Sequence, residues 1–201
     1  MGLVQRGRSR LWIDDQGWWL INVEFQPSSW SRGSYLNVGV QWLWHRSPTF
    51  SFEFGNRVAE AGFMPFETPE EFDQAANRLA ALAAEKVYAY RSLVSDVASL
   101  PRVLATGGTL DTRNAYHVAV ALALIGDTAG AETYMARAMI ASPTTGWHRE
   151  WNEQVRAVCE LLSDPARLRG HVTSVVLDQR MCLKLDQSRP IELPGSDARG
   201  G

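Results

Sequence analysis

Three polar side chains near the N-terminus have the types and spacing that metal-assisted hydrolysis of a phosphodiester would need. Asp14 precedes a predicted turn, and Glu24 and Gln26 follow it on the next strand. Two carboxylates on adjacent strands would hold Mg²⁺, and the third polar group would position a water molecule. Gln26 stands where a lysine is commoner in such sites, and the same residues also suit a solvated strand face. Both interpretations stay open.

A second set of residues suits binding better than catalysis, because flat rings beside amides can recognise a base, a sugar or a peptide. These candidate ligand-binding residues are Trp12, Trp18, Asn22, Tyr35, Asn37 and Gln41. We expect them on one polar face of a sheet, together with Glu24, Gln26 and His45. The alternative is that the rings are structural and are covered by the loop at 27–34 or by C-terminal helices.

The elements that carry these residues are strands, because polar and apolar residues alternate with a period of two. We expect strands at 10–14, 18–26, 35–45 and 49–54, with a turn at Asp15-Gln16-Gly17. Short links between consecutive strands favour an antiparallel sheet of three or four strands. The opposite, apolar face is formed by the residues Trp19, Ile21, Val23, Phe25, Leu36, Val38, Val40, Trp42 and Trp44.

Helices follow the strands. Thr68-Pro69-Glu70-Glu71 predicts a capped helix start, and apolar residues at helical spacing extend to about Leu100, before Pro101. This long helix should cover the apolar face of the sheet and leave the polar face wet. Further helices are expected at 112–125, 128–141, 147–163 and 165–183, although the β-branched stretch within 171–183 leaves helix or strand open.

The predicted fold class is therefore α+β: an antiparallel sheet with a long helix on one face, followed by an array of antiparallel helical hairpins. We expect residues 1–105 to form the sheet and its helix and residues 106–186 to form the hairpins, and we expect the two parts to make one compact unit. Residues 187–201 are rich in Pro, Gly, Ser and charge, which predicts a disordered tail.

One helical hairpin, at about 112–143, resembles a single tetratricopeptide unit. The residues that carry the resemblance are Ala119, Leu122, Gly126, Asp127, Ala131, Ala138 and Pro143. The small residues would let two helices approach closely, Gly126-Asp127 would form the turn, and Pro143 would stop the second helix. The resemblance implies a helical surface suited to binding another protein, while an ordinary antiparallel helix pair has the same features.

Residues 8–57 resemble a bacterial family known only as a domain of unknown function. The matching residues are Arg10, Trp12, the stretch WWLINVEFQ at 18–26, Ser28 or Ser29, and YLNVGV at 35–40. The resemblance covers about a quarter of the chain. It implies a fold with these strands near its start, and it carries no activity to this chain.

Composition and charge further limit the partners, the location and the cofactors to be expected. A net charge of −2 does not favour a nucleic-acid or anionic-membrane partner, although Arg6, Arg8 and Arg10 form a local cluster. There is neither a signal-peptide pattern nor an apolar run long enough for a membrane helix, and Cys159 and Cys182 read as buried thiols, so we expect a soluble, cytoplasmic protein. The four histidines have no metal-site spacing, and phosphate-loop and serine-elbow motifs are lacking, so no cofactor or metal is expected.

The sequence thus favours a non-catalytic module that binds a protein or peptide, through the helical hairpins or through the aromatic sheet face. One alternative is a nuclease-like hydrolase that uses Asp14, Glu24 and Gln26 with a metal ion. Another is a small-ligand sensor with a Trp-lined sheet face. An exposed edge strand and many aromatic residues also favour a homodimer.

Overall fold

The computed structural model describes residues 2–105 and 111–194. It is an α+β structure whose backbone divides into two compact units. Unit 1 comprises residues 1–42 and 49–93, and unit 2 comprises residues 43–48 and 94–201. The boundary predicted from the sequence lies at residue 105, whereas this division falls at residue 93 and assigns the short segment Leu43–Pro48 to the helical unit.

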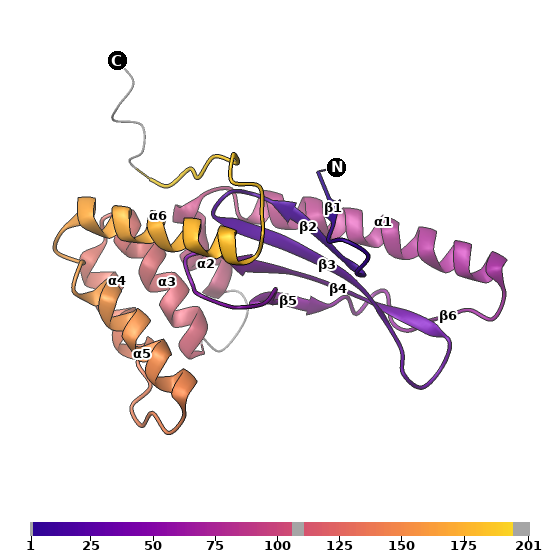
Figure 1. Cartoon of the computed structure of the whole chain (residues 1–201), viewed down its shortest axis with the longest axis horizontal. Helices are drawn as coiled ribbons and strands as arrows, with labels where there is room; N and C mark the ends of the chain where they lie inside the picture. The colour runs from indigo at the N-terminus through magenta and orange to yellow at the C-terminus, as the bar shows by residue number, and fades with distance from the viewer. Residues whose placement is uncertain (1, 106–110, 195–201) are drawn as a thin grey trace, which may run out of the picture. The chain divides into compact units, whose positions relative to one another are not determined.

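Unit 1 contains an antiparallel sheet in the order β1-β2-β3-β4-β5, with β6 also paired to β4. Figure 1 shows these strands with one long helix running along them. The strands are β1 (Val4–Gln5), β2 (Leu11–Asp15), β3 (Trp19–Pro27), β4 (Gly33–Trp42), β5 (Phe54–Arg57) and β6 (Met64–Pro65). The sequence predicted three or four strands and missed β1 and β6, because two residues are too few to show a period.

The register of β3 against β4 confirms the two predicted faces. Trp19 lies opposite Trp42 and Val23 opposite Val38, whereas Glu24 lies opposite Asn37. Opposite residues of an antiparallel pair share a face, so apolar and polar rows are kept apart. Helix α1 (Pro69–Leu93) packs on β3 and β4 and buries the apolar stripe Ala75, Leu79, Ala83 and Val87.

Helix α1 begins where the sequence predicted and ends earlier. Thr68 Oγ1 accepts a hydrogen bond from the Glu71 amide, and Glu71 Oε2 accepts one from the Thr68 amide, which is a capping box. The helix stops at Leu93 instead of about Leu100. Asp96 caps a new helical start, a 3₁₀ turn (Val97–Ser99) followed by α2 (Leu100–Ala105).

The predicted strand at 49–54 is wrong for most of its length, since β5 begins only at Phe54. Asn22 and Gln41 donate side-chain hydrogen bonds to the carbonyls of Ser51 and Thr49, and these contacts hold the segment as a loop. The predicted strand at 35–45 also shifts, because β4 ends at Trp42.

Unit 2 is helical. It contains α2, α3 (Thr112–Leu124), α4 (Thr128–Ala138), α5 (Gly146–Cys159) and α6 (Pro165–Cys182). Helix α3 packs on α2, α4 and α6, and α5 packs on α4. The range 171–183, which the sequence left open between helix and strand, is helical up to Cys182. Residues 183–194 form neither helix nor strand and Leu193 is buried; the rest of the predicted disordered tail, 195–201, lies outside the described residues.

Helices α3 and α4 form the predicted antiparallel hairpin. Ala119, Ala131 and Ala138 are fully buried, Gly126 has a φ of +88°, and the Asp127 carboxylate accepts a hydrogen bond from the Gly130 amide. A positive φ is accessible to glycine at little cost, which explains Gly126 at the turn. Helix α4 ends at Ala138, five residues before the Pro143 that was expected to stop it.

The close approach of α3 and α4 predicts that a larger side chain at Ala119 destabilises unit 2. Ala119→Leu should lower the free energy of unfolding by about 1–3 kcal/mol, because inserted methylenes must displace packed neighbours. Urea unfolding followed by circular dichroism measures this. Ala136→Leu, at an exposed position of α4, is the matched control and should change stability by less than about 0.5 kcal/mol. Equal effects of the two substitutions would contradict the packing argument.

Candidate functional site

The polar row of the sheet runs along β3 and β4. At its inner end, next to Trp42, its side chains make hydrogen bonds within unit 1. Asn22 and Gln41 are fully buried, and Asn22 Nδ2 donates to Gln41 Oε1 at 3.2 Å. Gln41 Oε1 also accepts from the Ser51 amide at 3.1 Å, and Asn22 Nδ2 donates to the Ser51 carbonyl at 2.7 Å. These two predicted ligand-binding residues therefore hold the loop between β4 and β5 in place.

At the outer end of the same row, polar side chains stay partly accessible. Asn37 Nδ2 donates to Glu24 Oε2 at 2.9 Å and to Gln26 Oε1 at 3.0 Å. Arg57 Nη2 donates to the same Gln26 oxygen at 3.0 Å, and its guanidinium lies 3.9 Å from the centre of the Tyr35 ring. This cluster brings together four of the predicted residues, Glu24, Gln26, Tyr35 and Asn37, and adds Arg57, which the sequence analysis did not single out.

Asp14 lies on the opposite face of the sheet from Glu24. It is paired with Ile21 of the apolar row, whereas Glu24 is paired with Asn37 of the polar row. The buried Asp14 carboxylate accepts hydrogen bonds from Arg91 Nε at 2.8 Å, Arg91 Nη2 at 2.6 Å and Gln16 Nε2 at 2.8 Å. This bidentate pair raises the pKa of Arg91. The sheet thus separates Asp14 from Glu24 and Gln26, and these three do not form one metal site.

Two of the predicted ring platforms also lie away from the polar face. Trp12 is paired with Val23 and so belongs to the apolar row. Trp18 is buried and stacks on Trp42 with ring centres 5.9 Å apart and planes 15° apart. The prediction of one exposed face bearing Trp12, Trp18 and Tyr35 is wrong in this respect. The register of β2 against β3 places Trp12 beside Val23, and Trp18 lies in the turn before β3 begins at Trp19. His45, placed on the same face, lies beyond the end of β4 in unit 2 and packs edge-on to Trp151.

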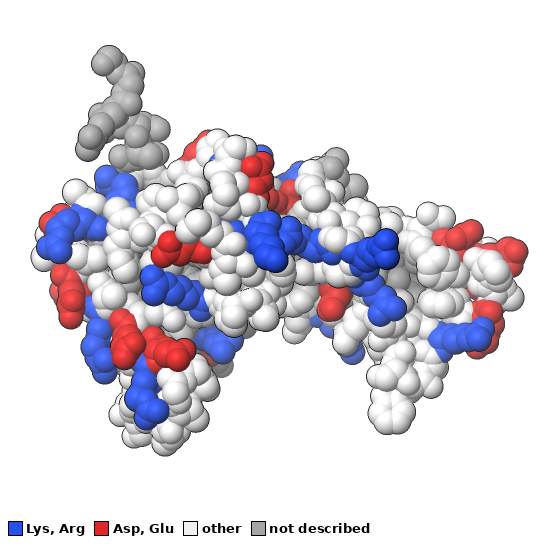
Figure 2. All heavy atoms as spheres, in the orientation of Figure 1, with Lys and Arg blue, Asp and Glu red and all other residues white. Residues whose placement is uncertain are grey.

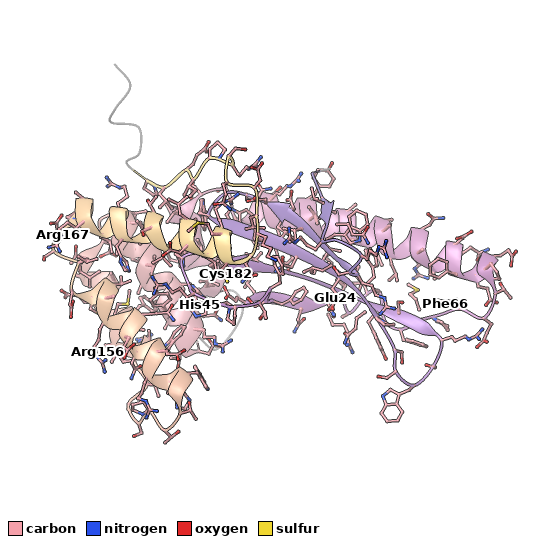
Figure 3. All side chains as sticks on the ribbon, in the orientation of Figure 1. Glu24, His45, Phe66, Arg156, Arg167 and Cys182 are labelled. Carbon is pink, nitrogen blue, oxygen red and sulfur yellow. The ribbon has the colours of Figure 1, made fainter. Side chains whose placement is uncertain are left out.

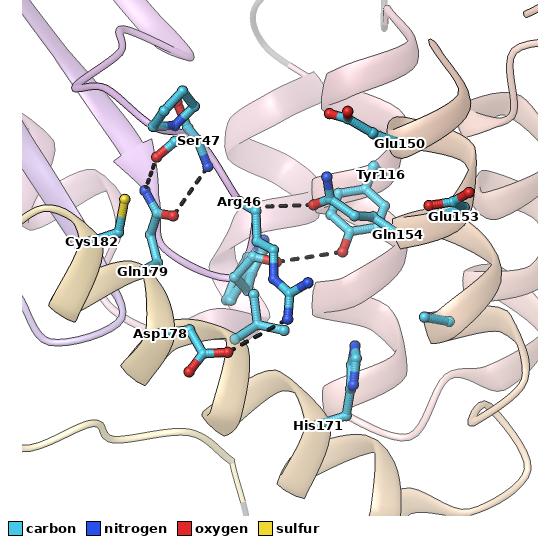
Figure 4. A pocket seen from close by; sticks show the side chains of 14 residues that line it. Arg46, Ser47, Tyr116, Glu150, Glu153, Gln154, His171, Asp178, Gln179 and Cys182 are labelled. Carbon is cyan, nitrogen blue, oxygen red and sulfur yellow. Dashed lines mark hydrogen bonds and ion pairs between the residues drawn. The ribbon is translucent and has the colours of Figure 1, made fainter. Parts of the chain in front are cut away.

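Unit 2 holds a cavity of about 760 Å³, which Figure 4 shows from close by. This volume is in the range of small-ligand and side-chain pockets. Its walls come from segment Leu43–Pro48, from α3, from α5 and from α6. The lining residues are Trp44, Arg46, Ser47, Pro48, Tyr116, Glu150, Glu153, Gln154, Ala157, His171, Val175, Asp178, Gln179 and Cys182.

Side chains of this cavity hold the backbone of segment Leu43–Pro48. Gln179 Oε1 accepts from the Ser47 amide at 3.1 Å while its Nε2 donates to the Ser47 carbonyl at 2.6 Å. Gln154 Oε1 accepts from the Arg46 amide at 3.1 Å, as Figure 4 also marks. The Tyr116 hydroxyl donates to the carbonyl of Trp44 at 3.4 Å. The helices thus hold this segment by hydrogen bonds to its main chain at Trp44, Arg46 and Ser47.

The charges around the cavity are mixed. Arg46 forms an exposed ion pair with Asp178 at 3.5 Å, and Glu150 and Glu153 add two carboxylates. Burial and the positive charge of Arg46 lower the pKa of His171, so its ring is neutral near pH 7. Cys182 also lines the cavity and is exposed, which corrects the expectation of a buried thiol, while Cys159 is half-buried and burial raises its pKa.

No pattern in the sequence predicted this cavity. Its residues come from four stretches of the chain, and no spacing joins Gln154 and Gln179 to Ser47. The available signal was the polar character of Gln179 on a helix whose neighbours Val175 and Val176 are buried. Among residues 2–105 and 111–194, the structure places no three His, Cys, Asp or Glu side chains where they could hold a metal ion.

No protein-family model matches the chain, and comparison with curated proteins and with solved structures finds no significant similarity. Within the described residues, the helices are too short or too polar to cross a membrane.

The buried amides of the sheet predict a stability effect that exposed polar residues do not share. Gln41→Leu should destabilise unit 1 by about 1–3 kcal/mol, because the Ser51 amide and the Thr49 carbonyl each lose a hydrogen bond to the Gln41 side chain. Hydrogen exchange should show faster exchange of the Ser51 amide. Gln26→Leu, at the accessible end of the row, is the control and should change both readouts less. Unchanged protection of Ser51 in Gln41→Leu would show that the loop is held by other contacts.

The environment of His171 predicts a pH dependence for unit 2. The folded-state pKa lies below the ordinary value of 6.5, so the unfolded chain binds a proton that the folded chain lacks as the pH falls below 6.5. Stability should therefore decrease on acidification through this range. Thermal unfolding between about pH 7.5 and pH 5.5 should show a shallower decrease in His171→Gln than in the unmodified chain. Parallel pH profiles for the two proteins would rule out this origin.

Proposed function

We propose that unit 2 is a non-catalytic module that binds a short segment of another protein in the cavity beside segment Leu43–Pro48. The observation that supports the proposal is that these helices already hold a non-helical segment of their own chain by its main chain. Gln179 contacts both the amide and the carbonyl of Ser47, and Gln154 contacts the amide of Arg46.

Contacts of this kind suit peptide recognition because they depend on the main chain and tolerate many side chains. In peptide-binding grooves, main-chain hydrogen bonds give affinity and side-chain pockets give specificity. The cavity of about 760 Å³ supplies such a pocket next to the bound segment. The antiparallel pairing of α3 and α4, which the sequence analysis compared with a tetratricopeptide unit, agrees with a binding role.

The positions of the polar side chains give less support to catalysis than to binding. His171 and Cys182 both line the cavity, and they lie eleven positions apart on one helix, which separates them by roughly 16 Å along its axis. A nucleophile and its base must come within hydrogen-bond distance, so these two do not form a pair. The alternative hydrolase site in unit 1 is divided by the sheet between Asp14 on one face and Glu24 with Gln26 on the other. The sensor alternative loses its platform, since Trp18 is buried.

A peptide library displayed on phage tests the proposal. Selection on the unmodified chain should enrich peptides with a shared pattern, and synthetic copies should bind in a fluorescence anisotropy titration. Ala157→Trp should weaken this binding by about tenfold or more, which corresponds to 1.4 kcal/mol or more, because the indole fills the cavity while the Gln154 and Gln179 contacts remain.

Ala129→Trp, at an exposed position of α4 outside the cavity, is the matched control and should leave the peptide affinity unchanged. The proposal fails if no pattern is enriched, or if the two tryptophan variants bind the selected peptides equally well.

A further inference from the structure

The chain's own Arg46 indicates which kind of side chain the cavity of unit 2 can receive. The Arg46 amide donates to Gln154 at 3.1 Å, and its guanidinium pairs with Asp178 at 3.5 Å. Figure 4 shows the Arg46 side chain among the residues that line the cavity, between α5 and α6. The segment that the helices hold by its main chain therefore also presents a cationic side chain to the cavity.

Two further carboxylates at the cavity have no counter-charge. Glu150 and Glu153 lie on α5, line the cavity and are exposed. Among residues 2–105 and 111–194, neither side chain has a hydrogen-bond or ion-pair partner. Of the described residues that line the cavity, Arg46 is the one Lys or Arg, and it is already paired with Asp178. Three carboxylates thus face one guanidinium, which leaves an excess of negative charge.

The basic residues of α5 do not balance this excess within the cavity. Arg149 and Arg156 flank the two glutamates in the sequence, and neither lines the cavity. Figure 3 shows Arg156 on the far side of α5 from His45 of segment Leu43–Pro48. In Figure 2 the visible surface over α5 carries Asp and Glu side chains interleaved with Lys and Arg. The negative excess is therefore a property of the cavity and not of the whole helix.

The cavity wall next to these carboxylates is apolar. Pro48, Ala157 and Val175 contribute apolar side chains to it. Ala157 and Glu153 are four residues apart on α5, about 6 Å along the helix axis, and so lie on the same face. Lys and Arg have an apolar stem and a charged end, and they pack the stem on apolar surface while the charge stays near water. The cavity offers both surroundings.

We propose that the cavity selects a Lys or Arg side chain of the segment that it binds, and that Glu150 and Glu153 bind the charged end. The inference rests on the proposed function, because it names the residue that a bound segment must present. Gln154 Nε2, which has no hydrogen-bond partner among the described residues, is available to donate to a carbonyl of the same segment. The same carboxylates disfavour an acidic or phosphorylated segment.

Replacement of the basic residue in a selected peptide tests the inference. A random octapeptide library displayed on phage and selected on the full chain should enrich Lys or Arg at one position. A fluorescein-labelled selected octapeptide should bind about fivefold or more tightly than its copy with Gln at that position, as measured by anisotropy at low ionic strength. Added salt should weaken the first peptide more than the second, because it screens the ion pairs.

Substitutions in the chain separate charge selection from a structural effect. Glu150→Gln and Glu153→Gln should each weaken binding of the basic peptide about two- to fivefold and leave that of its Gln copy unchanged. Arg46→Gln should strengthen binding of the basic peptide by about two- to fivefold, since it removes a positive charge and leaves Asp178 unpaired. Glu132→Gln and Arg137→Gln, exposed on α4, are the matched controls and should leave the affinity unchanged.

The outcomes distinguish charge selection from peptide binding as such. If the selected peptide binds and Ala157→Trp weakens it, but the Gln copy binds equally well, the peptide site stands and the selection of a basic residue is wrong. Equal effects of Glu153→Gln and Glu132→Gln would also contradict the selection, as would an unchanged or lower affinity in Arg46→Gln. Enrichment of acidic peptides would reverse it, and absence of any enriched peptide would contradict both proposals.

Discussion

The chain that follows β4 depends on side-chain amides for its backbone hydrogen bonds. After Trp42 it leaves the sheet, and up to Glu53 it forms no regular element. Buried amides and carbonyls without partners each cost about 1–3 kcal/mol, so such a segment needs substitutes for strand pairing. In unit 2, Gln154 and Gln179 supply them to Arg46 and Ser47. In unit 1, Asn22 and Gln41 supply them to the loop at 49–51.

This need for backbone hydrogen-bond partners explains why a polar strand face need not be a ligand-binding site. The period of two in β3 and β4 correctly predicts which residues share a face, because side chains alternate by geometry. It does not predict what covers that face. Asn22 and Gln41 look like ligand-binding residues in the sequence, and they are ligands for the chain's own backbone. The outer residues Glu24 and Asn37 continue the same row without such a cover, and no pattern distinguishes them from the inner pair.

Strand register and helix ends were predicted less well, because the same local sequence pattern is compatible with more than one structure. The turn after Asp15 decides whether Asp14 shares a face with Glu24, and a shift of one residue reverses the answer. The sequence predicts the turn but does not determine which residues of the two flanking strands pair. Similarly, Pro101 was read as the end of the long helix, although proline is tolerated in a first helical turn, and the Asp96 side chain provides the cap that starts it. A capping residue followed a few residues later by a proline is compatible with the end of one helix or with the start of the next. Here a new helix begins, and α2 packs on α3.

Charge limits the class of ligand that the cavity of unit 2 can take. Around this cavity, Arg46 is paired with Asp178, and Glu150 and Glu153 leave an excess of negative charge while His171 stays neutral. A polyanion is therefore repelled by this surface. The net charge of the whole chain is only −2, so composition alone could not reveal this local excess. It depends on which residues of α5 and α6 the fold brings to segment Leu43–Pro48.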